Sequence, residues 1–251
     1  MINQSKALED FIFTQQSLTT FENCPLKFKK RYIDKLRWDG MPGEEARRRV
    51  ELGNDFHLLA RRYFLGIDTG LSLVTSENDE LNRWMESLEK NFKLDPNARY
   101  LPEYKLRIIN SEFRLEANFD LLIINGNTIQ IWDWKTQLGE GPQKEISSAK
   151  WIDSLQSIVY LFVLKEQMPY LLGGSMEYEK ISMRYWQPDP PKVLAEIIYH
   201  DELHKEYCET LKRKIQNVLQ YDYSGFDKDH HNGHCRYCEF NRLCNGEQGL
   251  F

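Results

Sequence analysis

The chain has 251 residues, of which 41% are hydrophobic and 13% aromatic, so it can build a substantial core. Its net charge of -5 argues against wholesale binding to polyanions, and no apolar run approaches the roughly 18 residues that a membrane span needs. Because the chain also has no signal-peptide pattern, we expect a cytoplasmic protein without membrane association, folded as a single domain over residues 1–251.

The charge is unevenly distributed along the chain. Residues 24–62 carry eleven Lys or Arg against six Asp or Glu, a local charge of +5, which leaves -10 for the rest. The segment KFKKRYIDKLR, followed by EEARRRV, would suit a phosphate backbone. A solvated helical face explains the same charges equally well.

The first part of the chain has helical periodicity. A helix is predicted over residues 18–36, with Ser17 or Thr19 as its cap and the glycines of GMPG at 40–43 as its breaker. Two more helices are predicted over residues 44–64 and 77–92.

The period then changes to two, which predicts strands. Three strands are expected in YKLRII (104–109), FRLEANFDLLII (113–124) and TIQIWDWK (128–135), the last two joined by a tight turn at NGN. After them we expect a helix at 147–167, one or two strands at 177–187, and a long helix at 190–220 that opens at its prolines. This order predicts an α/β domain with a mixed sheet.

Two aspartates occupy the predicted hairpin, Asp120 in NFDLLII and Asp133 in IWDWK. A turn centred on Gly126 and Asn127 places their carboxylates opposite each other, where like charges destabilise a sheet by up to ~1 kcal/mol. Lys135 follows on the same face, because side chains alternate along a strand. Two carboxylates with backbone carbonyls and water suit Mg²⁺ or Mn²⁺, whereas a buried salt bridge between an aspartate and Lys135 is the plain alternative.

Asp120, followed on the next strand by Asp133-Trp134-Lys135, resembles the motif of the PD-(D/E)XK nuclease superfamily. His57 in LGNDFHLLARRY resembles the helix-borne histidine that RecB-type members use as an additional metal ligand. A histidine among apolar neighbours is more often a packed side chain, so this match gains weight only from the other motifs.

Gln156 and Tyr160 in LQSIVYLF match the Q-x-x-x-Y motif that follows the D-x-K strand in this family. The two residues share one helix face, and in the family they contact DNA and help to orient the active site. Such a pair is common by itself, but the order and separation of all four elements make the combination specific.

The resemblance implies a restriction-endonuclease-like fold, in which helices flank a mixed sheet. It assigns Asp120, Asp133, the carbonyl of Trp134 and His57 to Mg²⁺ or Mn²⁺, and it gives Lys135 the role of positioning or activating the attacking water.

Two further positions bear on this resemblance. Glu103 resembles an acidic residue often found ahead of the family's first strand, although acidic residues are common there. Asn118 stands where many relatives have a glycine, two residues before the first aspartate, which leaves the local backbone geometry open.

The tail HCRYCEFNRLCN contains Cys235, Cys238 and Cys244, one ligand short of a tetrahedral metal site. Cys24 in FENCPLKF is expected as the fourth, because Cys208 falls in the middle of a helix like a packed residue. One distant cysteine with a C-terminal triplet resembles the iron–sulfur nucleases, including AddB-like subunits and CRISPR-associated adaptation exonucleases, whose thiolates hold a 4Fe-4S cluster. A zinc site is the alternative.

The resemblance as a whole implies a Mg²⁺- or Mn²⁺-dependent deoxyribonuclease, an exonuclease acting on single-stranded DNA or frayed ends in DNA processing, repair or CRISPR adaptation. Phosphate contacts are expected from the basic residues Lys27, Lys29, Lys30 and Arg31. The sequence has no G-x-x-x-x-G-K-S/T loop, so a helicase, like a CRISPR integrase, would be a separate partner. The rival hypothesis is a non-catalytic DNA-binding or complex-assembly subunit with a structural cluster.

Overall fold

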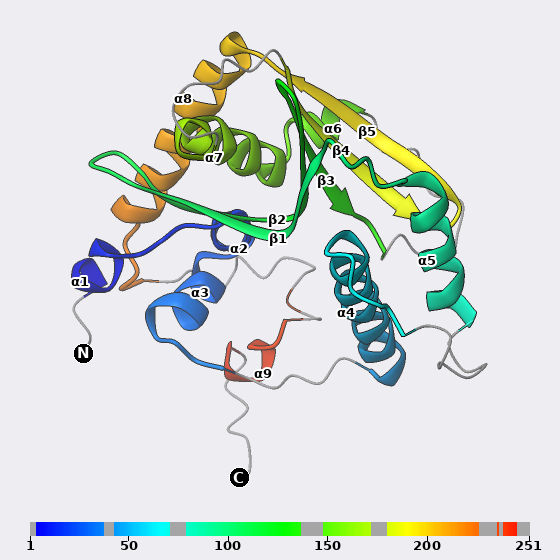
Figure 1. Cartoon of the computed structure of the whole chain (residues 1–251). Helices are drawn as coiled ribbons and strands as arrows, with labels where there is room; N and C mark the ends of the chain where they lie inside the picture. Colours follow the sequence, from blue (N-terminus) through cyan, green and yellow to red (C-terminus); the bar gives the residue numbers. More distant parts are fainter. Residues whose placement is uncertain are drawn as a thin grey trace.

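The computed structural model describes residues 4–37, 43–70, 79–136, 148–171, 180–225, 235 and 238–244 (Figure 1). The helices of this part of the chain are α1 (Gln4–Glu9), α2 (Gln15–Asn23), α3 (Pro25–Phe28), α4 (Glu44–Phe64), α5 (Asp79–Asn91), α6 (Ser148–Ile152), α7 (Leu155–Leu171), α8 (Asp201–Gln220) and α9 (Asn241–Cys244). A π-helical turn, η1 (Lys29–Ile33), follows α3. The strands are β1 (Arg99–Ile109), β2 (Arg114–Asn125), β3 (Thr128–Trp134), β4 (Lys180–Pro188) and β5 (Pro191–Tyr199).

These strands form one sheet in the order β1-β2-β3-β4-β5. Neighbouring strands are antiparallel except β3 and β4, which are parallel and therefore need a crossover connection, in which α6 and α7 lie. The mixed sheet flanked by helices confirms the α/β fold class expected from the sequence.

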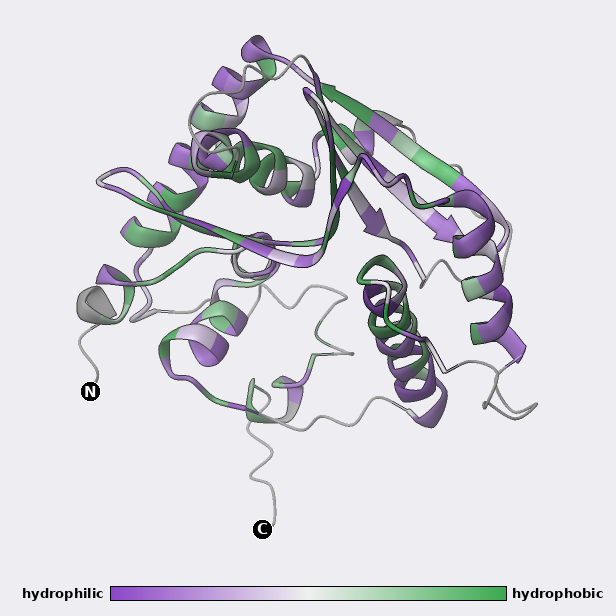
Figure 2. Ribbon diagram, in the orientation of Figure 1, coloured by the Kyte–Doolittle hydropathy of each residue, from purple (hydrophilic) through white to green (hydrophobic). Residues whose placement is uncertain are grey.

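Two hydrophobic cores cover the two faces of the sheet. The larger core packs α2, α7 and α8 against one face, and the smaller core packs α4 and α5 against the other (Figure 1). Figure 2 shows α7 as largely hydrophobic, as expected for a helix enclosed between the sheet and α8. None of the described helices combines the length and the apolarity of a membrane span.

The β2–β3 hairpin has the register that the turn predicts. Gly126, at φ +53°, and Asn127 form a two-residue turn, and Leu121 pairs with Trp132 at the far end of the ladder. Phe119 and Leu122 belong to the larger core, whereas Leu121 belongs to the smaller core, so the alternation of faces in β2 breaks between Phe119 and Leu121. The strand therefore changes the face of its side chains at Asp120.

The prediction of one long helix over residues 190–220 is wrong for the first third of this range. Residues Pro191–Tyr199 form β5, and the helix α8 begins only at Asp201. Ala195, Ile197 and Tyr199 are buried with a period of two, while Ile198 is exposed on the outer side of the edge strand. Hydrogen bonds to β4 hold these residues in a strand, although the local spacing of their apolar side chains also suits a helix.

The N-terminal helix also differs from its prediction. Thr14, rather than Ser17 or Thr19, is the N-cap of α2: its hydroxyl accepts from Ser17 N–H, and the Ser17 hydroxyl accepts from Thr14 N–H. The helix then ends at Asn23, because Pro25 cannot donate the hydrogen bond that would continue it. The predicted breaker at 40–42 lies outside the described residues.

The remaining predicted helices and strands are present, although β1 begins at Arg99, five residues before the predicted start at Tyr104. Helix α4 has the predicted bounds, and α5 begins at Asp79, since residues 77 and 78 lie outside the described residues. The helix predicted over 147–167 is divided into α6 and α7 at Asp153 and Ser154. Residues 177–179 of the next predicted strand also lie outside the described residues, and β4 begins at Lys180.

Candidate active site

Three carboxylates lie in one row across three adjacent strands. Pro102 of β1 pairs with Leu121, and Tyr104 with Phe119, so Glu103 comes opposite Asp120. The β2–β3 ladder ends at the pair Leu121 and Trp132, so Asp120 and Asp133 follow it on neighbouring strands, and the charge of Asp133 acts on Asp120. The Asp120 Oδ2 atom accepts a hydrogen bond of 2.8 Å from Trp134 N–H, which holds this carboxylate against β3.

Glu103 joins the row through an unusual backbone conformation. Its φ is +49°, in the left-handed region that costs a residue other than glycine about 1–3 kcal/mol. One Glu103 carboxylate oxygen accepts a hydrogen bond of 3.2 Å from the Asn118 amide, and the other lies 3.4 Å from His57 Nδ1. The carboxylate is therefore held at the row by its neighbours, at the expense of backbone strain.

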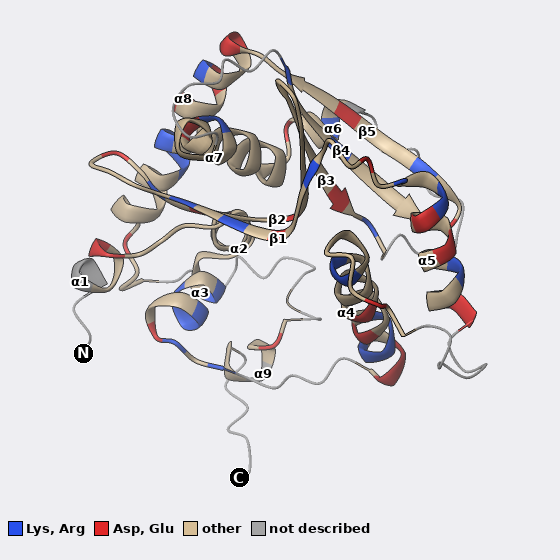
Figure 3. Cartoon of the chain, in the orientation of Figure 1, with Lys and Arg blue, Asp and Glu red and all other residues tan. Residues whose placement is uncertain are grey.

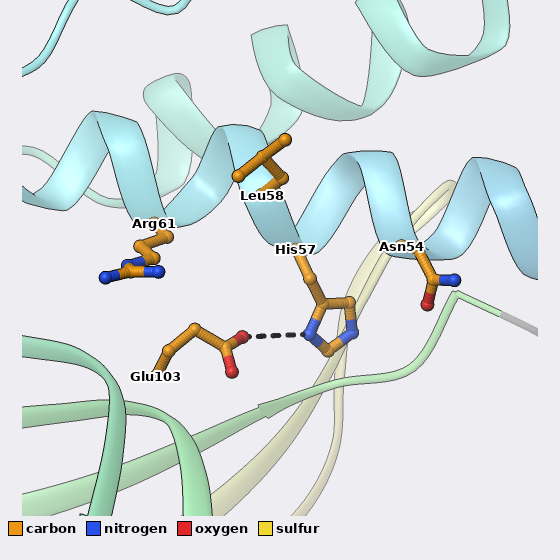
Figure 4. Close-up of a pocket in the computed structure, with 5 residues that line it drawn as sticks. All are labelled: Asn54, His57, Leu58, Arg61 and Glu103. Atoms are coloured by element: carbon orange, nitrogen blue, oxygen red, sulfur yellow. Dashed lines mark hydrogen bonds and ion pairs between the residues drawn. The ribbon is translucent and has the colours of Figure 1, made fainter.

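Helix α4 places His57 over this row. The His57 Nδ1 atom lies 3.4 Å from Glu103 Oε1 (Figure 4). The same atom lies 3.5 Å from Asp120 Oδ1. Burial lowers the pKa of His57, but the carboxylates of Glu103, Asp120 and Asp133 outweigh this effect and raise it above the usual 6.5. One ligand atom from each of His57, Glu103 and Asp120 fits within 4.8 Å of the others, a spacing suited to a shared cation.

Asp133 forms a polar triangle with Lys135 and Gln156. The Gln156 amide donates to Asp133 Oδ1 at 2.5 Å, and Lys135 Nζ donates to Gln156 Oε1 at 2.9 Å. Lys135 Nζ also lies 2.5 Å from Asp133 Oδ2, so the salt bridge considered from the sequence is present. Gln156, at the start of α7, thus binds both members of the D-x-K motif at once.

Two aromatic rings surround the Lys135 ammonium group, and the sequence motifs did not indicate either. Its Nζ lies 4.9 Å from the ring centre of Tyr185 and 5.7 Å from that of Trp151, within cation–π range. Tyr185 is the partner of Asp133 in the parallel β3–β4 ladder, and it is fully buried. A hydrogen bond of 2.7 Å between the Tyr185 and Ser157 hydroxyls fixes the ring. Only the three-dimensional register places these rings beside the lysine.

Tyr160 lies one turn after Gln156 on α7, as their spacing predicts. Its ring packs edge-on against Phe119, its hydroxyl is hydrogen-bonded to Gln156, and burial raises its pKa above the usual value of 10. The tyrosine is almost entirely buried. In this structure it supports Gln156 from the larger core.

The electrostatics of the row suit a divalent cation. Burial, and then the charge of Asp133, raise the pKa of Asp120 to about 8 in the protein alone. Burial also raises the pKa of Asp133, although the Lys135 ammonium beside its Oδ2 atom and the Gln156 amide on its Oδ1 atom oppose this rise. Carboxylates at this spacing beside a histidine are the donors that Mg²⁺ or Mn²⁺ takes, so the residues fit such an ion.

A pocket of about 350 Å³ opens beside the row (Figure 4). Its lining consists of Asn54, His57, Leu58 and Arg61 from α4 and Glu103 from β1. Sequence reasoning missed the other three α4 residues, although their spacing from His57 puts them on one helix face.

The N-terminal and C-terminal cysteines lie close together. Helix α9 lies beside α3 in Figure 1, and the charge of Cys24 contributes to the raised pKa values of Cys238 and Cys244, after the larger effect of burial. Cys24 Sγ accepts a hydrogen bond from Lys27 N–H at 3.4 Å, and Cys238 Sγ accepts one from Phe240 N–H at 3.4 Å. Among the described cysteines, no three sulfur atoms approach within 4.8 Å of one another.

The basic residues expected at phosphate groups are largely engaged within the protein. Lys27 and Arg31 both pair with Glu239, and Lys29 pairs with Asp34. Figure 3 shows basic residues on α3 and the turn η1 that follows it, and further ones along α4. Phosphate binding by Lys27, Lys29, Lys30 and Arg31 stays a prediction.

Comparison with known proteins agrees with this geometry. The crystal structure of an exonuclease candidate from Eubacterium rectale matches with a TM-score of 0.54, covering 99% of this chain and 92% of that chain at 12% identity, which shows a common fold. The crystal structure of SSO0001 matches at a TM-score of 0.42 and 17% identity, covering 98% of this chain and 95% of that chain. No curated protein matches the sequence. The family model of the PD-(D/E)XK nuclease superfamily matches residues 12–245, and the chain therefore belongs to that superfamily.

Proposed function

We propose that the protein is a metal-dependent deoxyribonuclease that hydrolyses phosphodiester bonds. The observation that carries this proposal is the row of Glu103, Asp120 and Asp133 with Lys135 at its end. A fold needs no such row for stability, because opposed carboxylates repel one another and Glu103 holds a strained backbone.

The metal ligands in this proposal are Asp120, Asp133, the carbonyl of Trp134 and His57, and the position of Glu103 adds it to the set. Mg²⁺ or Mn²⁺ bound there would polarise a phosphoryl oxygen and lower the pKa of a water molecule. His57 must be neutral to bind the ion, so binding displaces the proton that its carboxylate neighbours favour.

Lys135 and Gln156 act on the attacking water and on the developing charge. The Lys135 ammonium, held by Gln156 and the Tyr185 ring, lies at the end of the carboxylate row. From there it orients the water and stabilises negative charge on the phosphoryl oxygens in the transition state. Gln156 holds the side chains of Lys135 and Asp133 in place through its hydrogen bonds to both. Tyr160 supports Gln156 and the bound DNA strand.

The proposed substrate is single-stranded DNA or a frayed end, cut as by an exonuclease. The name of the Eubacterium rectale protein supports an exonuclease, and membership of the superfamily supports a nuclease. A helicase or a CRISPR integrase is the proposed partner.

The proposal includes a 4Fe-4S cluster on Cys24, Cys235, Cys238 and Cys244. These cysteines lie near one another, and N–H groups point at two of the sulfur atoms, as is common around iron–sulfur clusters. Sulfur ligands of a cubane are farther apart than the four ligands of one zinc ion, and no three sulfur atoms of the described cysteines lie within 4.8 Å of one another. Protein purified without oxygen should be brown and absorb near ~400 nm. A colourless protein with one zinc per chain would replace the cluster by zinc.

End-labelled single- and double-stranded DNA tests the enzymatic proposal. With Mg²⁺ or Mn²⁺, wild type should release short labelled products, and Lys135→Ala should reduce the rate by at least about 100-fold. Lys192→Ala, an exposed lysine of β5, controls for the loss of a positive charge. Equal cleavage by Lys135→Ala would remove the role given to this lysine. No cleavage by cluster-loaded wild type would favour the alternative, a DNA-binding or assembly subunit.

A further inference from the structure

Helix α4 presents a polar face to the pocket beside the carboxylate row. Asn54, His57, Leu58 and Arg61 are spaced at three, four and seven positions, so they form one stripe along the helix. His57 and Glu103 belong to the pocket and to the proposed metal site, which makes the two continuous. A group held in the pocket would therefore lie next to the reacting phosphate.

Arg61 brings a positive charge to this pocket that the protein itself does not neutralise. Within the described part of the chain, no carboxylate pairs with its guanidinium, and the side chain is exposed. The nearby Glu103 does not serve as its partner, because its oxygens contact His57 and Asn118. In contrast, Arg49 of the same helix pairs with Glu45, and Arg62 donates to the carbonyl of Asp68. Arg61 is thus available to an anion from outside.

Leu58 adds an apolar wall to the same pocket. It is 54% exposed and contributes to the pocket lining. Asn54, one turn earlier, offers an amide that has no partner among the described residues. A cation, an amide and an apolar surface in a cavity of about 350 Å³ match the phosphate, the polar edges and the sugar of one nucleotide.

We propose that this pocket binds one nucleotide of the substrate strand, adjacent to the bond that is cut. Arg61 binds the phosphate of that nucleotide, Leu58 packs against its sugar, and Asn54 hydrogen-bonds to it. This inference rests on the proposed nuclease function and adds to it a residue-level subsite on the α4 side. The planar guanidinium can bind two phosphate oxygens at once, so the subsite recognises the strand without reading its sequence.

Steady-state cleavage of a single-stranded oligonucleotide with Mn²⁺ tests the subsite. Arg61→Ala should raise KM by about 10- to 100-fold and change kcat by less than about threefold, because the contact is present in the ground state as well. Arg61→Lys should recover part of the loss, since it keeps the charge but not the two-pronged geometry. Arg48→Ala is the matched control: it is exposed on the same helix but points about 140° away, and its KM should equal that of wild type.

A neutral methylphosphonate linkage placed at successive positions of the oligonucleotide identifies the phosphate. At one position beside the cut bond, the linkage should raise the KM of wild type as much as the Arg61→Ala substitution does. The same linkage should not raise the KM of the Arg61→Ala variant any further. Additive losses at every position, or an unchanged KM for Arg61→Ala while wild type cleaves normally, would overturn the subsite and leave the nuclease proposal intact. If wild type neither binds nor cleaves any oligonucleotide, both proposals fail.

Discussion

Replacement of Asp120 by asparagine should stabilise the metal-free protein at high pH while it abolishes metal binding. Burial, with a further contribution from Asp133, raises the pKa of Asp120 to about 8 from its ordinary value of 3.8. His57 and the Trp134 N–H oppose this rise, and Glu103 adds to it. At pH 8 the folded protein therefore has to hold a charge that its surroundings disfavour. Asparagine keeps an oxygen for the hydrogen bond from Trp134 and removes the charge.

The sign and size follow from proton linkage. Between pH 4 and 8 the folded state keeps a proton on Asp120 that the unfolded state has lost, so the free energy of unfolding of wild type falls as the pH rises. One proton corresponds to about 1.4 kcal/mol per pH unit. The variant lacks this slope, and its advantage over wild type should grow by on the order of 4 kcal/mol from pH 5 to 8. Below pH 4 both states are protonated, and the difference is constant.

Urea unfolding in EDTA at several pH values, followed by tryptophan fluorescence without oxygen, measures this difference. The indole groups of Trp84, Trp134 and Trp186 lie in the smaller core and report its exposure. Asp153→Asn, an exposed aspartate, controls for the loss of one carboxylate. Mn²⁺ should reverse the order, because it stabilises only the protein that binds it. A variant no more stable than wild type at pH 8 in EDTA would refute the electrostatic reasoning.

Two other substitutions test neighbours of the row. Glu103→Gly should lower the cleavage rate at least tenfold, yet leave the free energy of unfolding in EDTA unchanged or up to ~1 kcal/mol higher, because glycine adopts the left-handed conformation without strain. Cleavage rates and thermal unfolding measure the two effects. A clear loss of stability would contradict this prediction. Tyr185→Phe keeps the ring beside Lys135 and should hold kcat within about threefold, whereas Tyr185→Leu should lower kcat by about 5- to 30-fold with little change in KM. Equal kcat values for the two Tyr185 variants would exclude the cation–π contact as a positioning interaction.

Local sequence patterns predicted the fold where an element stabilises itself. Helix α4 has apolar residues on one face and acidic residues in its first turn, and its predicted bounds are confirmed. The hairpin register followed from the turn at Gly126, which needs a positive φ. The strand β5 was missed because its identity comes from pairing with β4, and Val193, Leu194, Ile197 and Ile198 have spacing that suits a helix equally well.

The same distinction between local patterns and tertiary contacts applies to the candidate site. The nearness of Asp120 to Asp133 was predictable, since the turn at Gly126 fixes the hairpin register up to the neighbouring pair Leu121 and Trp132. Glu103 reaches the row through a left-handed backbone conformation. A glycine or asparagine in the sequence would indicate this conformation, but a glutamate does not. The pairing of Lys27 and Arg31 with Glu239, about two hundred residues away, leaves no local signal in the sequence.

The most direct test of the metal-dependent nuclease centre compares Mn²⁺-dependent degradation of end-labelled single-stranded DNA by wild type and Asp133→Asn. Wild type should degrade the strand only when the divalent ion is present. Asp133→Asn should remain folded and lose at least about 1,000-fold in rate, because it removes a buried carboxylate that we propose as a metal ligand and that pairs with Lys135. Degradation at the wild-type rate by the folded Asp133→Asn protein would contradict the account.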